Sequence, residues 1–232
     1  MRILLVELLA IILLLLVSCN NASSPSSSNN NSVEKPHKVK ISDSDLTKYG
    51  IANNPTNVLG GLKTGEKAPD FTLKDQDGNE VSLSDRLASG PVLMVFLRAE
   101  WCSFCRKHLQ AFQDNLIDIK ASGEAQVIAV SPQLPEYMQT FHQKNALNYP
   151  ILYDDNHAVM KDYKVFFHVT EKYNDYIKEA KGNSIEAFNG DEEPVMPIPA
   201  TYLIGQDGII KYVHYDPDYK QRSAMDVVMK AL

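Results

Sequence analysis

The sequence predicts an α/β fold in which a mixed sheet is flanked by helices. A continuous apolar run at 92–97 and a second segment at 126–131, which is apolar at 127–130, are typical of strands that are buried on both faces of a sheet. Apolar residues at helical spacing follow the first run, and a strand–turn–strand pattern at 200–215 precedes a last helix. Strands that alternate with helices and then end in a hairpin indicate a mixed central sheet with helices on both faces.

The first predicted elements are a hairpin, a buried strand and a helix. Residues 70–73 alternate like a strand, and the turn signal Asp-Gly-Asn at 77–79 leads into a second short strand at 81–83. The hairpin is thus an N-terminal extension of the sheet. After the buried run at 92–97, apolar residues spaced three and four apart across 109–119 predict one long helix, which ends at a Ser-Gly pair.

The second half alternates strands and helices before the closing hairpin. Residues 164–196 are less regular and rich in Tyr and Phe. The strands at 200–204 and 209–215 are joined by Gly-Gln-Asp-Gly, which is a strong hairpin signal. The other predicted elements are strands at 126–131 and 151–153 and helices at 135–145, 158–163 and 223–231.

The N-terminal segment lies outside this predicted domain. Residues 3–17, which are apolar except for Glu7, form a run that follows Arg2 and is shorter than the roughly 20 residues of a membrane-spanning helix. Such a run is typical of a secretory signal peptide. It ends in Leu-Val-Ser before Cys19, which resembles the bacterial lipobox. The resemblance implies cleavage before Cys19, lipidation of Cys19, and a cell-envelope protein that is lipid-anchored to a bacterial membrane and faces outside the cytoplasm. The alternative is an uncleaved anchor in which Cys19 is incidental.

The predicted organisation has three parts. Residues 20–32 are only Asn, Ser, Ala and Pro, a composition that gives a flexible tether and no core. We therefore predict a signal peptide at 1–18, a tether and extension at 19–60, and one domain at 61–232. The formal net charge of −6 argues against non-specific nucleic-acid binding, which needs a basic surface, so we expect no nucleic-acid partner.

The chemistry of the chain is predicted to lie in a Cys-x-x-Cys pair. The chain has three cysteines, too few for a disulfide scaffold, and with Cys19 acylated only Cys102 and Cys105 remain as thiols. The pair follows a buried strand and opens an amphipathic helix. The N-terminal end of a helix stabilises an anion and can lower a cysteine pKa from about 8.5 to roughly 3.5–7.5. Trp101 precedes the pair and is placed to shield it from water.

Three readings of the cysteine pair compete. Zinc usually takes four ligands and the chain has no second Cys-x-x-Cys, yet His108 makes a Cys, Cys, His site for zinc or copper conceivable. A structural disulfide closing so short a loop would contribute little stability. We therefore favour a redox-active dithiol formed by Cys102 and Cys105, with no cofactor and no bound metal.

At these residues the chain resembles the thioredoxin-fold superfamily, and within it the peroxiredoxin-like members of the alkyl hydroperoxide reductase and thiol-specific antioxidant family. The resemblance covers about 61–232. It rests on 65–73 (Gly-Glu-Lys-Ala-Pro-Asp-Phe-Thr-Leu), on 96–105 (Phe-Leu-Arg-Ala-Glu-Trp-Cys-Ser-Phe-Cys) and on 212–222, which contains Asp-Pro-Asp-Tyr. It implies a thioredoxin-like fold and an antioxidant thiol oxidoreductase.

The segment Ile-Pro-Ala-Thr at 198–201 is similar to the one where thioredoxin folds carry a cis-proline that faces the cysteines. We therefore expect a cis peptide bond before Pro199, since an X–Pro bond has a low cis penalty. Pro199 is accordingly a candidate substrate-binding residue. The alternative is an ordinary proline at the start of a strand.

The chain departs from the family at the activating motif. Typical peroxiredoxins carry Pro-x-x-x-Thr/Ser-x-x-Cys before the cysteine that attacks peroxide. With Cys105 in that place, the hydroxyl position is Cys102 and the proline position is Arg98; with Cys102 there, the two positions are Ala99 and Val95. Neither register keeps the hydroxyl and the proline, so the motif weakens the peroxidase interpretation that the family implies.

Two mechanisms use the same thiols. In peroxide reduction, Cys105 attacks the peroxide and Cys102 resolves the sulfenic acid to a disulfide, which an external thioredoxin-like thiol reductant resets. In disulfide exchange, Cys102 attacks a protein disulfide and Cys105 resolves it. Arg98 and Arg222 are candidate cationic partners in either case. Four aromatic residues of the irregular segment could cover the site: Phe166, Phe167, Tyr173 and Tyr176.

Overall fold

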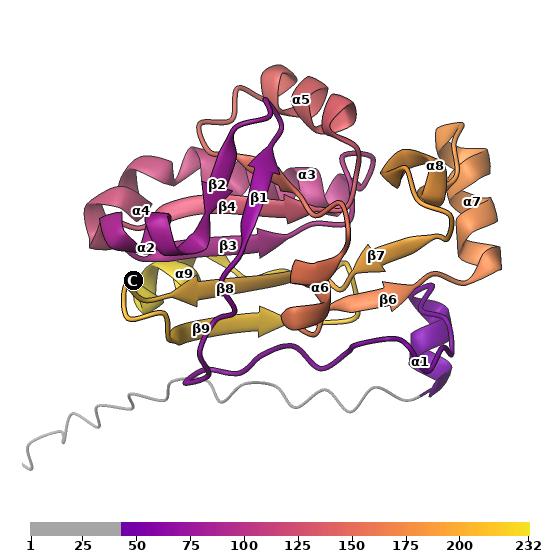
Figure 1. Ribbon diagram of the computed structural model, residues 1–232, viewed down its shortest axis with the longest axis horizontal. Coiled ribbons are helices and arrows are strands. Elements are labelled where there is room, and N and C mark those ends of the chain that lie inside the picture. Colours follow the sequence, from indigo (N-terminus) through magenta and orange to yellow (C-terminus); the bar gives the residue numbers. More distant parts are fainter. Residues whose placement is uncertain (1–42) are drawn as a thin grey trace, which may run out of the picture. The chain divides into compact units, whose positions relative to one another are not determined.

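The structure is a computed structural model that describes residues 43–232. Its centre is a mixed sheet, as the sequence predicts, with helices packed along it (Figure 1). The three inner strands β5, β4 and β3 are parallel, while the outer strands on both sides run antiparallel to their neighbours. In sheet order the strands are β2 (Glu80–Ser82), β1 (Thr72–Asp75), β5 (Ile151–Tyr153), β4 (Gln126–Ser131), β3 (Val92–Phe96), β8 (Ala200–Ile204) and β9 (Ile210–Tyr215).

The core lies around β3 and its two neighbours. Every residue of β3 and of β8 is buried, as expected for strands that are covered on both faces. The register pairs Phe96 at the end of β3 with Val130 on β4 and with Ala200 on β8. The chain that leaves β3 after Phe96 therefore emerges between two strands that fix its position, and this is where the dithiol segment begins.

The predicted long helix after the dithiol is two helices. α3 (Ser103–Asp114) ends at Asn115, and α4 (Leu116–Gly123) begins directly after it. The side chain of Asn115 donates a hydrogen bond to the carbonyl of Ala111 at 2.8 Å, so it competes with the helical backbone and ends the first segment. The other helices that flank the sheet are α2 (Leu83–Ser89), α5 (Pro135–Lys144), α6 (Ala158–Asp162) and α9 (Met225–Ala231).

Residues 164–196, which we call the insert, are more regular than the sequence indicates. Together with Pro197, the last residue of β7, they form a two-stranded antiparallel sheet and two helices: β6 (Phe166–His168), α7 (Glu171–Lys181), α8 (Ile185–Asn189) and β7 (Val195–Pro197). In α7 only Ile177 is buried, so the sequence shows no stripe of apolar residues from which the helix could be predicted. Its capping residues do mark its ends: Thr170 accepts from the backbone N–H of Tyr173, and Gly182 adopts the left-handed conformation.

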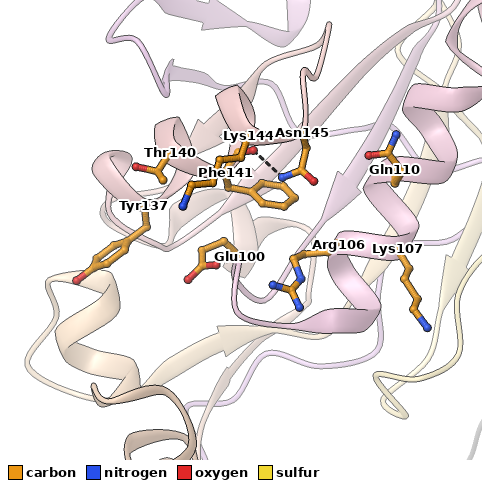
Figure 2. A pocket seen from close by; sticks show the side chains of 9 residues that line it. All are labelled: Glu100, Arg106, Lys107, Gln110, Tyr137, Thr140, Phe141, Lys144 and Asn145. Carbon is orange, nitrogen blue, oxygen red and sulfur yellow. Dashed lines mark hydrogen bonds between the residues drawn. The ribbon is translucent and has the colours of Figure 1, made fainter.

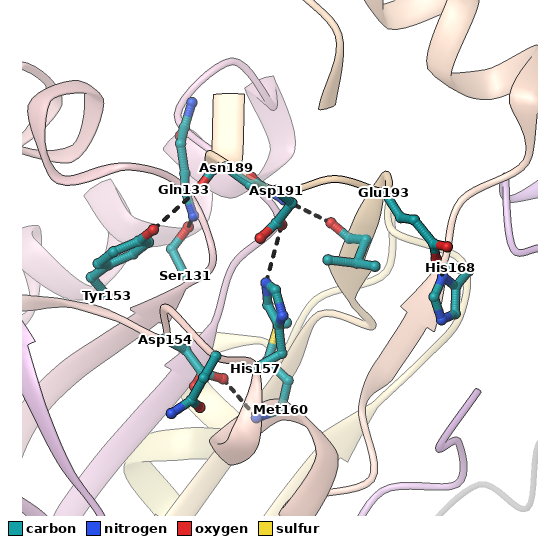
Figure 3. A network of polar contacts seen from close by, with 12 residues as sticks. Ser131, Gln133, Tyr153, Asp154, His157, Met160, His168, Asn189, Asp191 and Glu193 are labelled. Carbon is teal, nitrogen blue, oxygen red and sulfur yellow. Dashed lines mark hydrogen bonds and ion pairs between the residues drawn. The ribbon is translucent and has the colours of Figure 1, made fainter. Parts of the chain in front are cut away.

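Polar contacts fasten the insert to the main body (Figure 3). His157 Nε2, at the start of α6, lies 3.1 Å from the carboxylate of Asp191. The hydroxyl of Tyr153 donates to the carbonyl of Asn189 at 3.1 Å. Within the insert, His168 Nδ1 lies 2.9 Å from Glu193. These contacts fix the end of α8 next to β5 and so hold the insert in place.

The first described residues pack along the insert. After α1 (Asp43–Lys48), Ile51 is fully buried and forms a β-bridge with Val169. The backbone N–H of Ala52 donates to His168 at 2.8 Å, and that of Val58 donates to Phe166 at 3.0 Å. The later part of the predicted extension is therefore ordered against β6.

No helix within residues 43–232 has the length and apolar character needed to cross a bilayer. The predicted signal peptide at 1–18, the lipidation site Cys19 and the tether up to residue 42 lie outside the described residues.

Candidate dithiol active site

The two cysteines lie where the chain turns from β3 into α3. Cys102 is the N-cap residue of α3, and Cys105 lies in its first turn. The backbone N–H of Cys102 donates to the carbonyl of Ala99 at 3.3 Å, which closes the turn after the strand. Both thiols are reduced and buried, with 5% of Cys102 and 2% of Cys105 exposed. The strand, the turn and the helix start are arranged as the sequence predicts.

The two thiols have opposite acidities. Burial alone would raise the pKa of Cys105, but the hydrogen bond from the Cys102 thiol and the charges of Arg222 and Arg98 outweigh it and lower that pKa to about 5. The pKa of Cys102 is raised, first by its hydrogen bond to Cys105 and then by burial. Near neutral pH the pair therefore shares one proton, which resides on Cys102, and Cys105 is the thiolate.

Arg98 provides a buried positive charge beside this thiolate. Only 2% of the residue is exposed, and its guanidinium lies in a cage of aromatic rings. The carbon Cζ is 4.2 Å from the ring centroid of Tyr219, 5.1 Å from that of Tyr173 and 5.5 Å from that of Trp101. One Nη2–H donates to the hydroxyl of Tyr173 at 2.5 Å. The cage fixes the guanidinium in place without neutralising it.

Arg222 approaches Cys105 from another element. Its Nη2 donates to Cys105 Sγ at 3.5 Å, and its Nη1 donates to the carbonyl of Gln221 at 2.9 Å. The side chain is half-buried. Two arginines that are 124 positions apart in the sequence thus converge on one sulfur, and both were candidates on sequence grounds.

Trp101 lies against Arg98 and also contacts Phe188 of α8, with ring centroids 6.3 Å apart. It is 7% exposed, so its ring is buried between Arg98 of the dithiol segment and the insert. Phe188 comes from the insert, which also supplies Tyr173. The insert therefore helps to cover the site, whereas Tyr176 of α7 is exposed and Phe166 and Phe167 are buried around β6.

The expectation of a cis peptide bond before Pro199 is wrong, since the structure has no cis peptide bond among residues 43–232. The segment runs extended from β7 into β8, and the backbone N–H of Ile198 donates to the carbonyl of Val165 at 2.7 Å. An extended trans chain satisfies the pairing on both sides, so nothing turns the backbone toward the thiols. No hydrogen bond in the described part of the chain links Pro199 to either cysteine.

The alternative of a zinc or copper site at Cys102, Cys105 and His108 has no support in the described part of the chain. His108 is buried and uses Nε2 in a hydrogen bond with Ser223 Oγ at 3.0 Å. Within residues 43–232, no group of three or more His, Cys, Asp or Glu side chains is arranged to hold a metal ion. Cys102 and Cys105 therefore lack the third ligand that the alternative required.

A hollow of about 580 Å³ opens beside the first turns of α3, facing α5 (Figure 2). Glu100 and Arg106 point into it from either end of the dithiol segment, and burial raises the pKa of the Glu100 carboxyl. Sequence reasoning did not single out this surface. Its lining residues are Glu100, Arg106, Lys107, Gln110, Tyr137, Thr140, Phe141, Lys144 and Asn145.

The acidity of Cys105 predicts an unusual pH profile for alkylation. A thiolate with a pKa of about 5 stays ionised as the pH falls through 7, because a lowered pKa extends the reactive form to lower pH. We expect the rate of Cys105 labelling by iodoacetamide, followed by peptide mass spectrometry, to stay level down to about pH 6 and to fall near pH 5. A midpoint near the ordinary value of about 8.5 would contradict this assignment.

The fold and the dithiol at the start of α3 define a thioredoxin-like thiol oxidoreductase. A family model described as the AhpC/TSA family matches residues 64–213. Peroxiredoxin Bcp of Escherichia coli (strain K12) is 29% identical over 174 residues, which cover 75% of this chain and 97% of that protein. Peroxiredoxin Q, chloroplastic, of Suaeda salsa is 28% identical over 176 residues, covering 76% and 70%.

The likeness extends to solved structures. The crystal structure of Peroxidoxin BcpB from Mycobacterium tuberculosis matches with a TM-score of 0.57 at 22% identity, covering 73% of this chain and 96% of that one. The chain therefore belongs to the AhpC/TSA family, as the resemblance implied, and is a peroxiredoxin-like thiol peroxidase.

Proposed function

We propose that the protein reduces peroxides through a dithiol–disulfide cycle in which Cys105 attacks and Cys102 resolves. The observation that carries the proposal is the buried, acidic Cys105 thiolate, which receives a hydrogen bond from Cys102 and lies beside the cations Arg98 and Arg222. A thiolate is the nucleophilic form of cysteine, and fixed positive charge stabilises the negative charge that develops on the peroxide oxygens.

The chemistry balances with these groups. The Cys105 thiolate attacks one peroxide oxygen, the O–O bond breaks, and the leaving alkoxide or hydroxide takes up a proton, which the Cys102 thiol can supply. Cys105 becomes a sulfenic acid. The Cys102 thiolate then attacks the Cys105 sulfur and expels hydroxide, which a solvent proton converts to water, and a disulfide remains. An external dithiol donates two electrons and two protons, which restore the Cys102 thiol and the Cys105 thiolate and return one proton to solvent, and we propose a thioredoxin-like protein as this donor.

The altered family motif supports this assignment of roles. In the register that puts Cys105 at the attacking position, Cys102 stands where the family has Thr or Ser, and its thiol donates to Cys105 in place of the hydroxyl. Arg98 stands at the proline position and places a caged guanidinium beside the thiolate. The chain thus keeps a hydrogen-bond donor at the first position and a group that shields the thiolate at the second, although both side chains differ from those of the family.

Disulfide exchange is the second candidate function, and the site favours it less. It needs Cys102 as the attacking thiolate, yet Cys102 is 5% exposed and its pKa is raised. Trp101 and Tyr173 enclose the neighbouring Arg98, and Cys102 itself is buried, so a partner protein would have to open this segment before its disulfide could reach Cys102.

A lipid anchor at Cys19 is part of the same proposal. The lipobox-like segment before Cys19 supports a mature protein that is tethered to a bacterial membrane and faces outside the cytoplasm. Metabolic labelling of the full chain with a radioactive fatty acid tests it. Label that is absent from Cys19→Ser supports the anchor, and equal label in both chains, or none in either, contradicts it.

Thiol counting distinguishes the two functions of the dithiol. Mixing the reduced protein with one equivalent of hydrogen peroxide or an alkyl hydroperoxide is expected to remove both thiols, because sulfenic acid formation and resolution consume Cys105 and Cys102 together. A thiol reagent such as DTNB under denaturing conditions measures the loss. Thiols that survive peroxide while the protein rapidly reduces insulin disulfides would support disulfide exchange instead.

A further inference from the structure

A chain of three buried polar side chains lies behind the Cys105 thiolate and takes no part in the chemistry above. His108 Nε2 is 3.0 Å from Ser223 Oγ, and Ser223 Oγ donates to Thr201 Oγ1 at 3.1 Å. Exposed fractions are 8% for His108, 5% for Ser223 and 1% for Thr201. Since the single hydroxyl hydrogen of Ser223 goes to Thr201, a neutral His108 must donate its Nε2–H to Ser223.

This chain of hydrogen bonds joins three structural elements around Arg222. His108 is on α3, one turn after Cys105, and Thr201 is on β8. Ser223 directly follows Arg222 in the loop 216–224, so the backbone that carries the guanidinium is held on one side by the helix and on the other by the sheet. Buried polar groups of this kind are costly to leave unpaired, which makes the arrangement specific.

Arg222 depends on such support because it has no carboxylate partner. Its hydrogen bonds are to Cys105 Sγ and to the carbonyl of Gln221, and it forms no ion pair with any residue in 43–232. A half-buried guanidinium that approaches a sulfur at 3.5 Å loses hydration, and a free loop would let it return to water. A backbone anchor next to Arg222 would oppose this return to water.

We propose that the His108–Ser223–Thr201 hydrogen-bond chain is a positioning device that holds the guanidinium of Arg222 against the Cys105 thiolate and so sets its acidity. The three residues do not touch the reacting atoms; they act through Arg222. The inference rests on the proposed role of Cys105 as the acidic thiol, but it requires nothing about which oxidant Cys105 meets.

The charges around Cys105 are consistent with this device. The cations are Arg222 and Arg98, and the neighbouring titratable groups are Cys102, His108 and His214 of β9. Burial, with the charges of Arg222 and His214, lowers the pKa of His108 to about 3, and burial also lowers the pKa of His214. Both imidazoles are therefore neutral near pH 7, so neither repels Arg222 from the sulfur.

A double-mutant cycle tests the proposal. The readout is the lower of the two apparent pKa values of the dithiol, followed by thiolate absorbance near 240 nm in wild type, Ser223→Ala, Arg222→Gln and the double variant. Arg222→Gln is expected to raise it by about one unit, since a cation at this distance lowers a thiol pKa by roughly that amount. Ser223→Ala is expected to give most of the same rise, and the double variant no more than Arg222→Gln alone.

Matched variants separate positioning from loss of stability. Ser82→Ala removes an N-cap hydroxyl of α2, which accepts from Asp85 N–H at 3.0 Å, and should lower the melting temperature without moving the thiol pKa. Ser223→Thr keeps the hydroxyl and should restore the wild-type value. His108→Asn removes the imidazole at the other end of the hydrogen-bond chain. If Ser223→Ala does not fold, His108→Asn replaces it in the test and should raise the thiol pKa in the same way.

The cycle has clear contrary outcomes. An unchanged thiol pKa in folded Ser223→Ala overturns the proposal, and so does a Ser223→Ala shift that adds in full to that of Arg222→Gln, since the serine would then act by another route. These results are independent of peroxide. If the double-mutant cycle gives the expected pKa shifts but the protein does not reduce peroxide, the proposed function is wrong and the positioning role still holds.

Discussion

Replacing Cys105 by Ser is expected to abolish peroxide reduction, with a loss of about a thousandfold or more in the second-order rate constant. The serine hydroxyl cannot replace a thiolate whose pKa is about 5, because it stays protonated under the same two guanidiniums. Stopped-flow fluorescence of Trp101, the only tryptophan in the chain, measures the reaction from beside the site.

Cys102→Ser is the matched variant, and it is expected to react with one equivalent of peroxide and then stop. The serine hydroxyl can still donate to Cys105, as the family's Thr or Ser would, but it cannot form a disulfide. The sulfenic acid on Cys105 should accumulate and react with dimedone, which mass spectrometry detects. The reverse pattern, with an active Cys105→Ser and an inert Cys102→Ser, would exchange the two roles.

Local sequence signals were enough to place the dithiol. A buried apolar run, a turn and helical spacing are all short-range patterns, and they put Cys102 and Cys105 at the start of α3. The break at Asn115 was missed because apolar spacing continues through it, while the cause is a hydrogen bond from its side chain. Helix α7 was missed because its exposed surface leaves little apolar periodicity, although Thr170 and Gly182 mark its ends.

The surroundings of the thiols depend on contacts between distant residues. Arg98 was noticed because it departs from the family motif, but nothing near it in the sequence indicates that Tyr173 and Tyr219 enclose it. The expectation for Pro199 failed because it carried over a feature of the wider superfamily. The pairing of β6 with β7 and of β3 with β8 decides that backbone, and such pairing is not a local property of the sequence.

Arg98→Met is expected to slow the reaction of the reduced protein with peroxide by about a hundredfold. Methionine fills much of the space but removes the charge, and one lost electrostatic contact to a developing anion typically costs that much or more. The pKa of Cys105 should rise, because Arg98 is one of the cations that lower it. Single-turnover stopped-flow at several pH values measures the rate and the pKa in one experiment.

Two further variants decide whether the charge or the cage matters. Arg86→Met on α2 removes a half-buried arginine that donates to Gln126 at 3.3 Å, away from the thiols, and should leave the rate unchanged. Arg98→Lys keeps the charge but loses the planar stack on Tyr219. If it recovers the thiol pKa without the rate, charge sets the acidity while the caged geometry of the guanidinium orients the peroxide. If it recovers neither, the planar guanidinium is what keeps the charge inside the aromatic cage, since a flexible ammonium would leave this buried position for water.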